Sequence, residues 1–247
     1  MTMSFENKVI LITGAASGFG KLLAETLSPQ GAKLILGDLN EAGVKAVADS
    51  LPGEAVAMVC NVAVEEEVKA LVEASVTHFG GLDIAVNNAG ISSPPKSLLE
   101  ITEKEMDINF AVNAKSILFG MKYQIPLMLE NGGNILNVAS AAGMGGAPKL
   151  AHYCAAKHAA VGLTKTAALE FARQNVRVNA ICPYFTQTPM VDGARAAGMG
   201  EIMEKGSPMK RLGEPEEIVS MMMSIMMPSN SYMTGQCINV DGGVSAF

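Results

Sequence analysis

The segment YCAAK, residues 153–157, places a tyrosine and a lysine four positions apart. In a helix such positions lie one above the other on the same face, so the Lys157 ammonium can sit close to the Tyr153 phenol. A free tyrosine has a pKa of about 10, too high for a base at neutral pH, but a neighbouring cation stabilises the phenolate. The pair is therefore a candidate general acid and base. Because this spacing also occurs by chance in many helices, the rest of the chain must decide.

A glycine-rich turn is a candidate phosphate site. TGAASGFG follows the apolar run KVILIT and contains Gly14, Gly18 and Gly20. Glycines let the backbone turn tightly and approach a pyrophosphate, whose charge then meets the free N–H groups at the start of the next helix. A strand before the turn and a helix after it are the context that this mechanism requires.

A carboxylate ends the second predicted strand. Asp38 lies 18 residues after Gly20, where it can accept hydrogen bonds from an adenosine ribose and would repel a 2′-phosphate. The turn GAASG contains no Lys or Arg, and Leu39 follows the acid. This pattern favours NAD(H) over NADP(H). The alternative is that Asp38 only opens the turn DLNE.

Short apolar runs alternate with segments of helical period. They predict strands at 8–13, 33–38, 55–60, 82–88, 133–140, 176–182 and 236–241, and helices at 18–30, 41–50, 65–79, 103–130, 151–174 and 215–227. Such alternation implies right-handed crossovers and an open parallel sheet. We expect a single α/β domain over residues 1–247: a doubly wound Rossmann fold with seven parallel strands and helices on both faces.

Composition limits the class of partner. Of 247 residues, 49% are hydrophobic and 17% charged, and the formal net charge is −6. An acidic chain without a basic stripe argues against nucleic acid or an anionic membrane as partner. The four cysteines lack the spacing of a zinc site, so we expect reduced, mostly buried thiols and no metal. The N-terminus lacks the features of a signal peptide, which predicts a cytoplasmic protein.

Two further segments stand out. The methionine-rich run at 219–228 is too short to span a bilayer, so we expect it to fill core or subunit-interface space. Residues 184–213 carry five glycines and no strand pattern. A long insertion after a strand end lies above the crevice where open α/β sheets bind ligands, so we predict a mobile substrate lid there.

Together these motifs resemble the short-chain dehydrogenase/reductase family over almost the whole chain. TGAASGFG is similar to its TGxxxGxG turn, NNAG (87–90) to its motif after the fourth strand, NVAS (137–140) with YCAAK to its catalytic segment, and DGG (241–243) to its C-terminal signature. Tyr153 lies 13 residues after Ser140, the family's usual interval. The ordered and correctly spaced set favours a catalytic role for the Tyr–Lys pair.

The resemblance implies an NAD-dependent alcohol dehydrogenase, or a carbonyl reductase in the opposite direction. Tyr153 would exchange the proton of a secondary alcohol or ketone, with Lys157 and the oxidised nicotinamide lowering the tyrosine pKa. Ser140 would hydrogen-bond the substrate oxygen. Lys157 would also bind the nicotinamide ribose, and Asn113 would hold a water that links Lys157 to solvent.

The resemblance also assigns residues to the cofactor. Thr188 and Pro183 match the segment whose threonine reaches the nicotinamide carboxamide, and Asn61 stands where the family usually has an aspartate near the adenine. The predicted cofactor contacts are Gly14, Ser17, Gly18, Phe19, Gly20, Asp38, Leu39, Asn61, Val62, Asn87, Ala89, Gly90, Tyr153, Lys157, Pro183 and Thr188.

The substrate pocket departs from the family pattern at one position. Tyr184 replaces the usual glycine after Pro183, which narrows the pocket or adds a stacking wall unless the ring points to solvent. The predicted substrate contacts are Ser140, Ala142, Met144 and Tyr184. Their largely apolar character favours an apolar or aromatic alcohol or ketone.

Two other functions stay open. A 3-oxoacyl-thioester reductase of fatty-acid synthesis has the same fold, although such enzymes tend to use NADPH and to need a basic surface for their acidic carrier protein. A non-catalytic NAD-binding redox sensor is the alternative from another class, since fold does not imply function. The resemblance further implies a homotetramer in which the helices around 103–130 and 151–174 pack against their mates.

Overall fold

A computed structural model describes residues 5–246 of the chain, apart from the side chains of Ala194 and Ala197. Seven parallel strands form one sheet, as the sequence predicts, and their order in it is β3-β2-β1-β4-β5-β6-β7. The strands are β1 (Val9–Thr13), β2 (Lys33–Asp38), β3 (Ala55–Val59), β4 (Ile84–Asn87), β5 (Gly133–Val138), β6 (Val176–Pro183) and β7 (Cys237–Val240). Strand order reverses between β1 and β4, and open α/β sheets bind ligands beside such a point.

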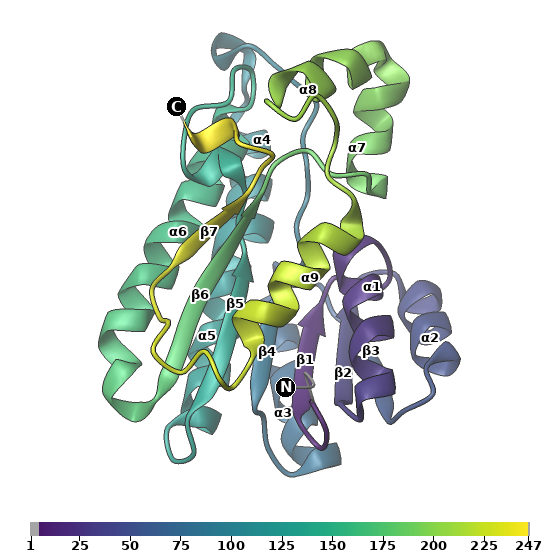
Figure 1. Cartoon of the computed structure of the whole chain (residues 1–247), viewed down its shortest axis with the longest axis vertical. Helices are drawn as coiled ribbons and strands as arrows, with labels where there is room; N and C mark the ends of the chain where they lie inside the picture. The colour runs from purple at the N-terminus through teal and green to yellow at the C-terminus, as the bar shows by residue number, and fades with distance from the viewer. Residues whose placement is uncertain (1–4, 247) are drawn as a thin grey trace.

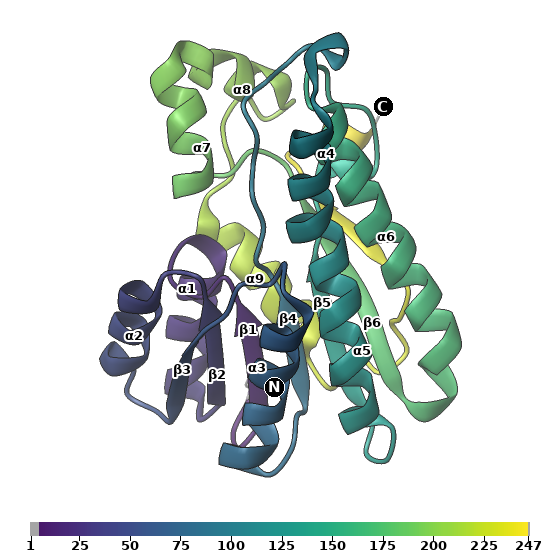
Figure 2. The ribbon, with the colours of Figure 1, turned by 180° about the vertical axis from the view of Figure 1, so that it is seen from behind.

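Helices cover both faces of the sheet (Figures 1 and 2). One face carries α1 (Gly18–Leu27), α2 (Glu41–Ser50) and α9 (Pro215–Met226), and the other carries α3 (Glu65–Phe79), α5 (Ser116–Met128) and α6 (Ala151–Phe171). Successive β1 residues alternate between the two cores: Leu11 packs on the α3 and α5 side, Ile10 and Ile12 on the α1 side. Full burial of such side chains contributes about 1.5–3 kcal/mol each.

The predicted helix at 103–130 is two helices joined by an irregular turn. α4 (Glu103–Phe110) starts with a capping box in which Thr102 and Glu105 bond each other's backbone N–H groups. A π-helical turn, Ala111–Lys115, then leads into α5. In such a turn each backbone hydrogen bond spans five residues and not four. Helical periodicity in the sequence does not reveal this extra residue. It places Asn113 in the interior, where the side chain is 1% exposed.

The methionine-rich run fills core space, as predicted. Met222, Met223 and Met226 on α9 are almost fully buried between the sheet and α1. Unbranched, polarisable side chains suit such irregular gaps. Within residues 5–246, no helix is long and apolar enough to cross a membrane. All four cysteines are free thiols: Cys60 and Cys182 are buried, whereas Cys154 and Cys237 are only half-buried.

Residues 184–213 form a helical excursion above the ends of the strands (Figure 1). It contains α7 (Pro189–Ala194), a kinked turn at Arg195–Met199 in which Gly198 has φ +83°, and α8 (Gly200–Gly206). A parallel bridge between Thr186 and Gly213 joins its two ends. Val191, Met203 and Leu212 form a small core of its own. We call this segment the lid; its mobility stays a prediction.

Candidate active site

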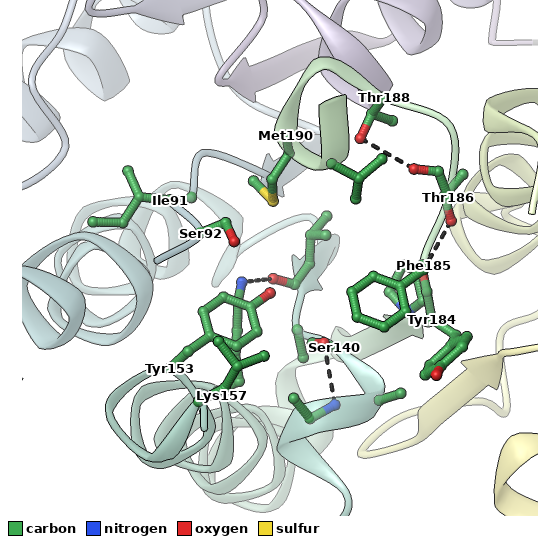
Figure 3. A pocket seen from close by; sticks show the side chains of 18 of the residues that line it. Ile91, Ser92, Ser140, Tyr153, Lys157, Tyr184, Phe185, Thr186, Thr188 and Met190 are labelled. Carbon is green, nitrogen blue, oxygen red and sulfur yellow. Dashed lines mark hydrogen bonds between the residues drawn. The ribbon is translucent and has the colours of Figure 1, made fainter. Parts of the chain in front are cut away.

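A cavity of about 1030 Å³ opens at the carboxyl ends of the strands, between the sheet and the lid (Figure 3). Most of the predicted site residues line it: Gly14, Ser17, Gly18, Phe19, Asp38, Leu39, Asn61, Val62, Ala89, Gly90, Ser140, Ala142, Met144, Tyr153, Lys157, Pro183, Tyr184 and Thr188. Gly20, Asn87 and Asn113 are not among the lining residues. The fold therefore brings predicted cofactor, catalytic and substrate residues from distant segments to one space.

The turn after β1 has no room for side chains. Gly14 has φ +68°, and a Cβ there would lie 2.8 Å from the Cα of Ala89. A Cβ on Gly20 would overlap the carbonyl oxygen of Gly14, so Gly20 allows α1 to pack closely under the turn. Its predicted cofactor contact stays a prediction. Ser17, at the N-cap of α1, makes no side-chain capping bond, so N–H groups of the first helical turn stay available. Such a bare cradle fits the pyrophosphate of a dinucleotide.

Asp38 has the turn role that the sequence left open, and its place in the cavity keeps the ribose role available. Its Oδ1 accepts from the N–H of Asn40 and its Oδ2 from the N–H of Ala16, both at 2.9 Å, so it shapes the turn after β2 and anchors the glycine-rich turn. It also lines the cavity, beside the 69% exposed Leu39. An ionised carboxylate has about four acceptor sites, which leaves capacity for ribose hydroxyls.

The NNAG motif presents Asn88, not Asn87, to the cavity. Asn87 is buried and bonds to Gln124 and Asn137, so its side chain supports the central strand but lies in the core and not, as also predicted, beside the adenosine. Asn88 lines the cavity and donates from Nδ2 to the carbonyl oxygens of Thr13 and Gly14, at 2.9 and 3.1 Å. Sequence reasoning missed Asn88. The available signal was the end of the strand. Side chains within β4, up to Asn87, point into one or the other face of the sheet, whereas Asn88 is the first residue beyond the strand.

The predicted adenine end is built from the turn after β3. Asn61 and Val62 line the cavity there. The Asn61 side chain is already used locally, since Oδ1 accepts from the N–H of Ala63 at 3.1 Å. An amide oxygen has a second lone pair, so acceptance from an adenine amino group stays compatible with this geometry.

Ser140, Tyr153 and Lys157 border the other part of the cavity (Figure 3). Ser140 follows β5, and its Oγ accepts from the N–H of Ala142 at 3.1 Å. Its hydroxyl also hydrogen-bonds Tyr153, so the two hydroxyl groups lie side by side. Tyr153 and Lys157 lie in the first two turns of α6, with Lys157 Nζ 5.8 Å from the centre of the Tyr153 ring. The four-residue spacing thus places both side chains on one face, as predicted.

The electrostatics of this pair differ from the prediction. Burial raises the pKa of Tyr153 and outweighs the hydrogen bond with Ser140, which lowers it. Burial also lowers the pKa of Lys157 to about 8. Lys157 Nζ donates to the carbonyl oxygen of Val138 at 2.8 Å. The protein on its own therefore raises the tyrosine pKa, because an apolar environment disfavours both charged forms.

Asn113 lies behind the cavity wall. Its Oδ1 accepts from the N–H of Ile91 at 3.0 Å, and its Nδ2 donates to the Ile91 carbonyl oxygen at 3.1 Å. A Cβ on Gly90 would lie 2.9 Å from Asn113 Oδ1 and 3.6 Å from Lys157 Nζ, so Gly90 separates the two side chains. Asn113 thus fixes the segment after β4 against Lys157. The predicted water relay stays a prediction.

The substrate part of the cavity is mainly apolar. Ala142 and the 42% exposed Met144 line it from the segment after β5. The lid adds Phe185 and Met190, which sequence reasoning missed, although apolar residues just after a strand end were the available signal (Figure 3). Thr188 lies over the glycine-rich turn, because its side chain would be 3.9 Å from a Cβ on Gly18. The lid therefore reaches both parts of the cavity.

The described part of the chain offers acid–base groups but no cluster for a metal. No three His, Cys, Asp or Glu side chains within residues 5–246 are grouped so that they could hold a metal ion. The Ser140 and Tyr153 hydroxyls and the Lys157 amine border the same part of the cavity. They can hold a substrate oxygen and exchange its proton.

Known proteins resemble this chain over nearly its full length. The family model described as enoyl-(acyl carrier protein) reductase matches residues 14–245. The 2,5-dichloro-2,5-cyclohexadiene-1,4-diol dehydrogenase of Sphingobium indicum is 38% identical over 243 residues, 97% of each chain. The cyclohexanol dehydrogenase of an Acinetobacter species is 38% identical over 250 residues, 100% of this chain and 98% of that one.

A solved structure has a similar fold over nearly the full length of the chain. The crystal structure of a 3-ketoacyl-(acyl-carrier-protein) reductase from Brucella melitensis, complexed with NADH, has a TM-score of 0.92 at 36% identity. The similarity covers 98% of this chain and 100% of that one. The similarity in fold and in sequence therefore extends over the whole sheet and the lid.

Proposed function

Because the chain belongs to the short-chain dehydrogenase/reductase family and is an oxidoreductase of alcohol and ketone groups, we propose that it interconverts cyclic secondary alcohols and ketones with NAD(H). One observation carries the proposal: Ser140, Tyr153 and Lys157 border the same cavity as the glycine-rich turn and Asp38. Hydride and proton must meet at one carbonyl group, so the two sets of residues have to share one space.

The side chains act on the substrate oxygen and its proton. Ser140 donates a hydrogen bond to that oxygen and holds it beside Tyr153. Tyr153 takes the proton of an alcohol, or returns it to a ketone in the reverse direction. Since burial raises the tyrosine pKa, forming the phenolate requires a cation, and Lys157 is the one within reach. When bound, the nicotinamide accepts or supplies the hydride.

The charges around the cavity support NAD(H) over NADP(H). Of the described residues that line it, only Lys149 and Lys157 are cationic, and both lie on the catalytic and substrate side. Asp38 therefore faces the predicted ribose site without a Lys or Arg to pair a 2′-phosphate. The NADH complex of the Brucella reductase is consistent with this preference.

Two observations support a cyclic substrate: the names of similar dehydrogenases and the side chains that line the substrate part of the cavity. The names of the two dehydrogenases specify cyclic alcohols as substrates. In this chain Met144, Phe185 and Met190 give the substrate part an apolar surface that suits a carbocycle. A 3-oxoacyl-thioester is the second candidate because the Brucella reductase has this fold, but a net charge of −6 does not suit an acidic carrier protein.

We also propose a cytoplasmic homotetramer. Three large apolar side chains on the helices expected to meet their mates are exposed in the single chain, namely Ile108 (47%), Leu118 (46%) and Leu169 (85%). Exposed apolar area of this kind favours association. Light scattering coupled to size-exclusion chromatography should give four times the chain mass of 25.8 kDa, and a monomer at micromolar concentration would contradict the proposal.

The direct experiment is an absorbance assay at the reduced-nicotinamide band. Cyclohexanol, cyclohexanone, linear secondary alcohols and an acetoacetyl thioester should be compared with NAD(H) and NADP(H). We expect the cyclic pair with NAD(H) to give the highest kcat/KM. Thioester turnover that exceeds it would favour the second candidate. Measurable NADH binding without turnover of any substrate would favour the redox sensor.

A further inference from the structure

An aromatic pair lines the cavity on the side away from Tyr153. Tyr184 and Phe185 lie side by side across Ser140 from the catalytic tyrosine (Figure 3). Their ring centres are 4.7 Å apart and their planes meet at 65°, an edge-to-face contact. Such contacts contribute about 0.5–1.5 kcal/mol beyond the buried area, so the two rings act as one wall.

A second, small cavity lies behind this wall. It measures about 110 Å³ and borders the end of the lid, α9 and the segment after β7. Tyr184, Phe185 and Asp241 line both this cavity and the large one. The aromatic pair therefore forms, together with Asp241, the partition between the two cavities.

Tyr184 is held firmly in this partition. Its N–H donates to the carbonyl oxygen of Val240 at 3.1 Å, and its carbonyl oxygen accepts from Thr186 Oγ1 at 3.0 Å. The phenol oxygen lies against Gly206 at the end of α8, where a Cβ would overlap it. Phe185 packs on the lid core of Val191, Met203 and Leu212. Neither ring can swing aside without displacing the lid.

We propose that Tyr184 is a specificity-determining residue that closes the substrate part of the cavity opposite Tyr153. This inference rests on the proposed function and names its substrate class: single-ring secondary alcohols and ketones without a long substituent across the ring from the reacting carbon. Once the tyrosine ring is removed, the small cavity behind the wall can accept such a substituent.

The test compares kcat/KM for cyclohexanol and 4-hexylcyclohexanol with NAD. The wild type should prefer cyclohexanol, and Tyr184→Ala should shift the ratio toward the hexyl compound by on the order of 10-fold or more, since one misfit methylene costs about 10-fold. Tyr184→Leu, which keeps an apolar side chain for folding, should give a smaller shift in the same direction. Tyr184→Phe, which keeps the ring, should retain the wild-type ratio.

A matched control is Tyr232→Ala, since this tyrosine is fully exposed and does not line either cavity. A binding measurement without turnover separates this inference from the proposed function. Calorimetry should measure the binding of the corresponding cyclohexanones in the presence of oxidised NAD, because no hydride can be transferred between a ketone and oxidised NAD. Tighter binding of the hexyl ketone to Tyr184→Ala supports the inference even if the alcohols are not oxidised. An unchanged ratio in both Tyr184→Ala and Tyr184→Leu, or binding of no cyclohexanone, would overturn it.

Discussion

The two parts of the cavity are built in different ways. The cofactor part consists of short turns that are locked to one another through the backbone: Thr13 Oγ1 accepts from the N–H groups of Asn88 and Ala89 at 3.0 and 3.1 Å, and Asp38 accepts from Ala16. The substrate part depends on the lid, which holds itself together through a small apolar core. The first part tolerates few residue types, whereas the second accepts many apolar side chains of suitable size.

This difference suggests which residues any such protein must keep for cofactor binding and which ones set the substrate preference of one protein. A turn that has no room for a Cβ at Gly14 or Gly20 dictates glycine, and a carboxylate that accepts two N–H bonds dictates an acid. Apolar packing in the lid sets only volume and shape. Changes in the cofactor part should therefore reduce cofactor binding whatever the substrate. Changes in the apolar core of the lid should alter the kinetics of individual substrates.

The largest effect should come from Gly20→Val. Its side chain would overlap Gly14, whose position the cradle depends on. We expect NADH binding to weaken by on the order of 100-fold, equivalent to about 3 kcal/mol. Fluorescence titration measures it, with Gly81→Ala as control because no atom lies within 4 Å of a Cβ there. Equal dissociation constants for the two variants would contradict the cradle.

A second test uses the buried charge of Lys157. Burial lowers its pKa from 10.5 to about 8, so between these values the unfolded chain holds a proton that the folded protein has lost. Stability from this group therefore rises with pH in that window, by at most about 3 kcal/mol. Urea unfolding at pH 7.5 and 10 should show the increment in the wild type relative to Lys157→Met. Parallel pH dependence in both proteins would count against it.

Asp38→Asn should lower the preference for NAD over NADP. The amide removes the charge that repels a 2′-phosphate and one charged acceptor for the ribose, a hydrogen-bond loss of about 1.5–3 kcal/mol. The ratio of kcat/KM for the two cofactors should fall by on the order of 10-fold. Asp49→Asn, on the exposed side of α2, is the matched control. A ratio unaffected by Asp38→Asn would assign the residue to the turn alone.

The smallest effect should come from the lid core. Met203→Ala removes a 2% exposed side chain that packs with Val191 and Leu212. Looser packing there should raise KM for the alcohol by a few-fold, roughly the effect of 1 kcal/mol, and leave NADH affinity unchanged. Steady-state kinetics and NADH titration on the same preparation measure both. Weaker NADH binding instead would erase the contrast between the two parts.

The sheet could be predicted from the sequence because each strand is a continuous apolar run. Strand ends were placed less well: the predicted strand 82–88 is β4 (Ile84–Asn87), and this boundary decides whether Asn87 or Asn88 faces the cavity. The π-helical turn at Asn113 leaves no mark in helical periodicity. The lid helices were not predicted because the glycines in that segment obscure the helical pattern.

The catalytic set could be predicted, but its electrostatics could not. Spacing along a helix places Tyr153 and Lys157 together. Their pKa values depend on the depth of burial and on the Val138 carbonyl that Lys157 bonds, which are properties of the folded chain. The contact of Tyr184 with Gly206 and the small cavity behind it likewise join segments that no local pattern connects.

The central claim is that Tyr153 carries the proton in a cavity that also binds NAD(H). The most direct test is single-turnover oxidation of cyclohexanol by Tyr153→Phe with NAD, together with NADH titration of the same variant. The account predicts that the rate falls by on the order of 10² to 10⁴ while the dissociation constant of NADH changes little, because only the hydroxyl is removed. A rate close to that of the wild type would show that another group moves the proton.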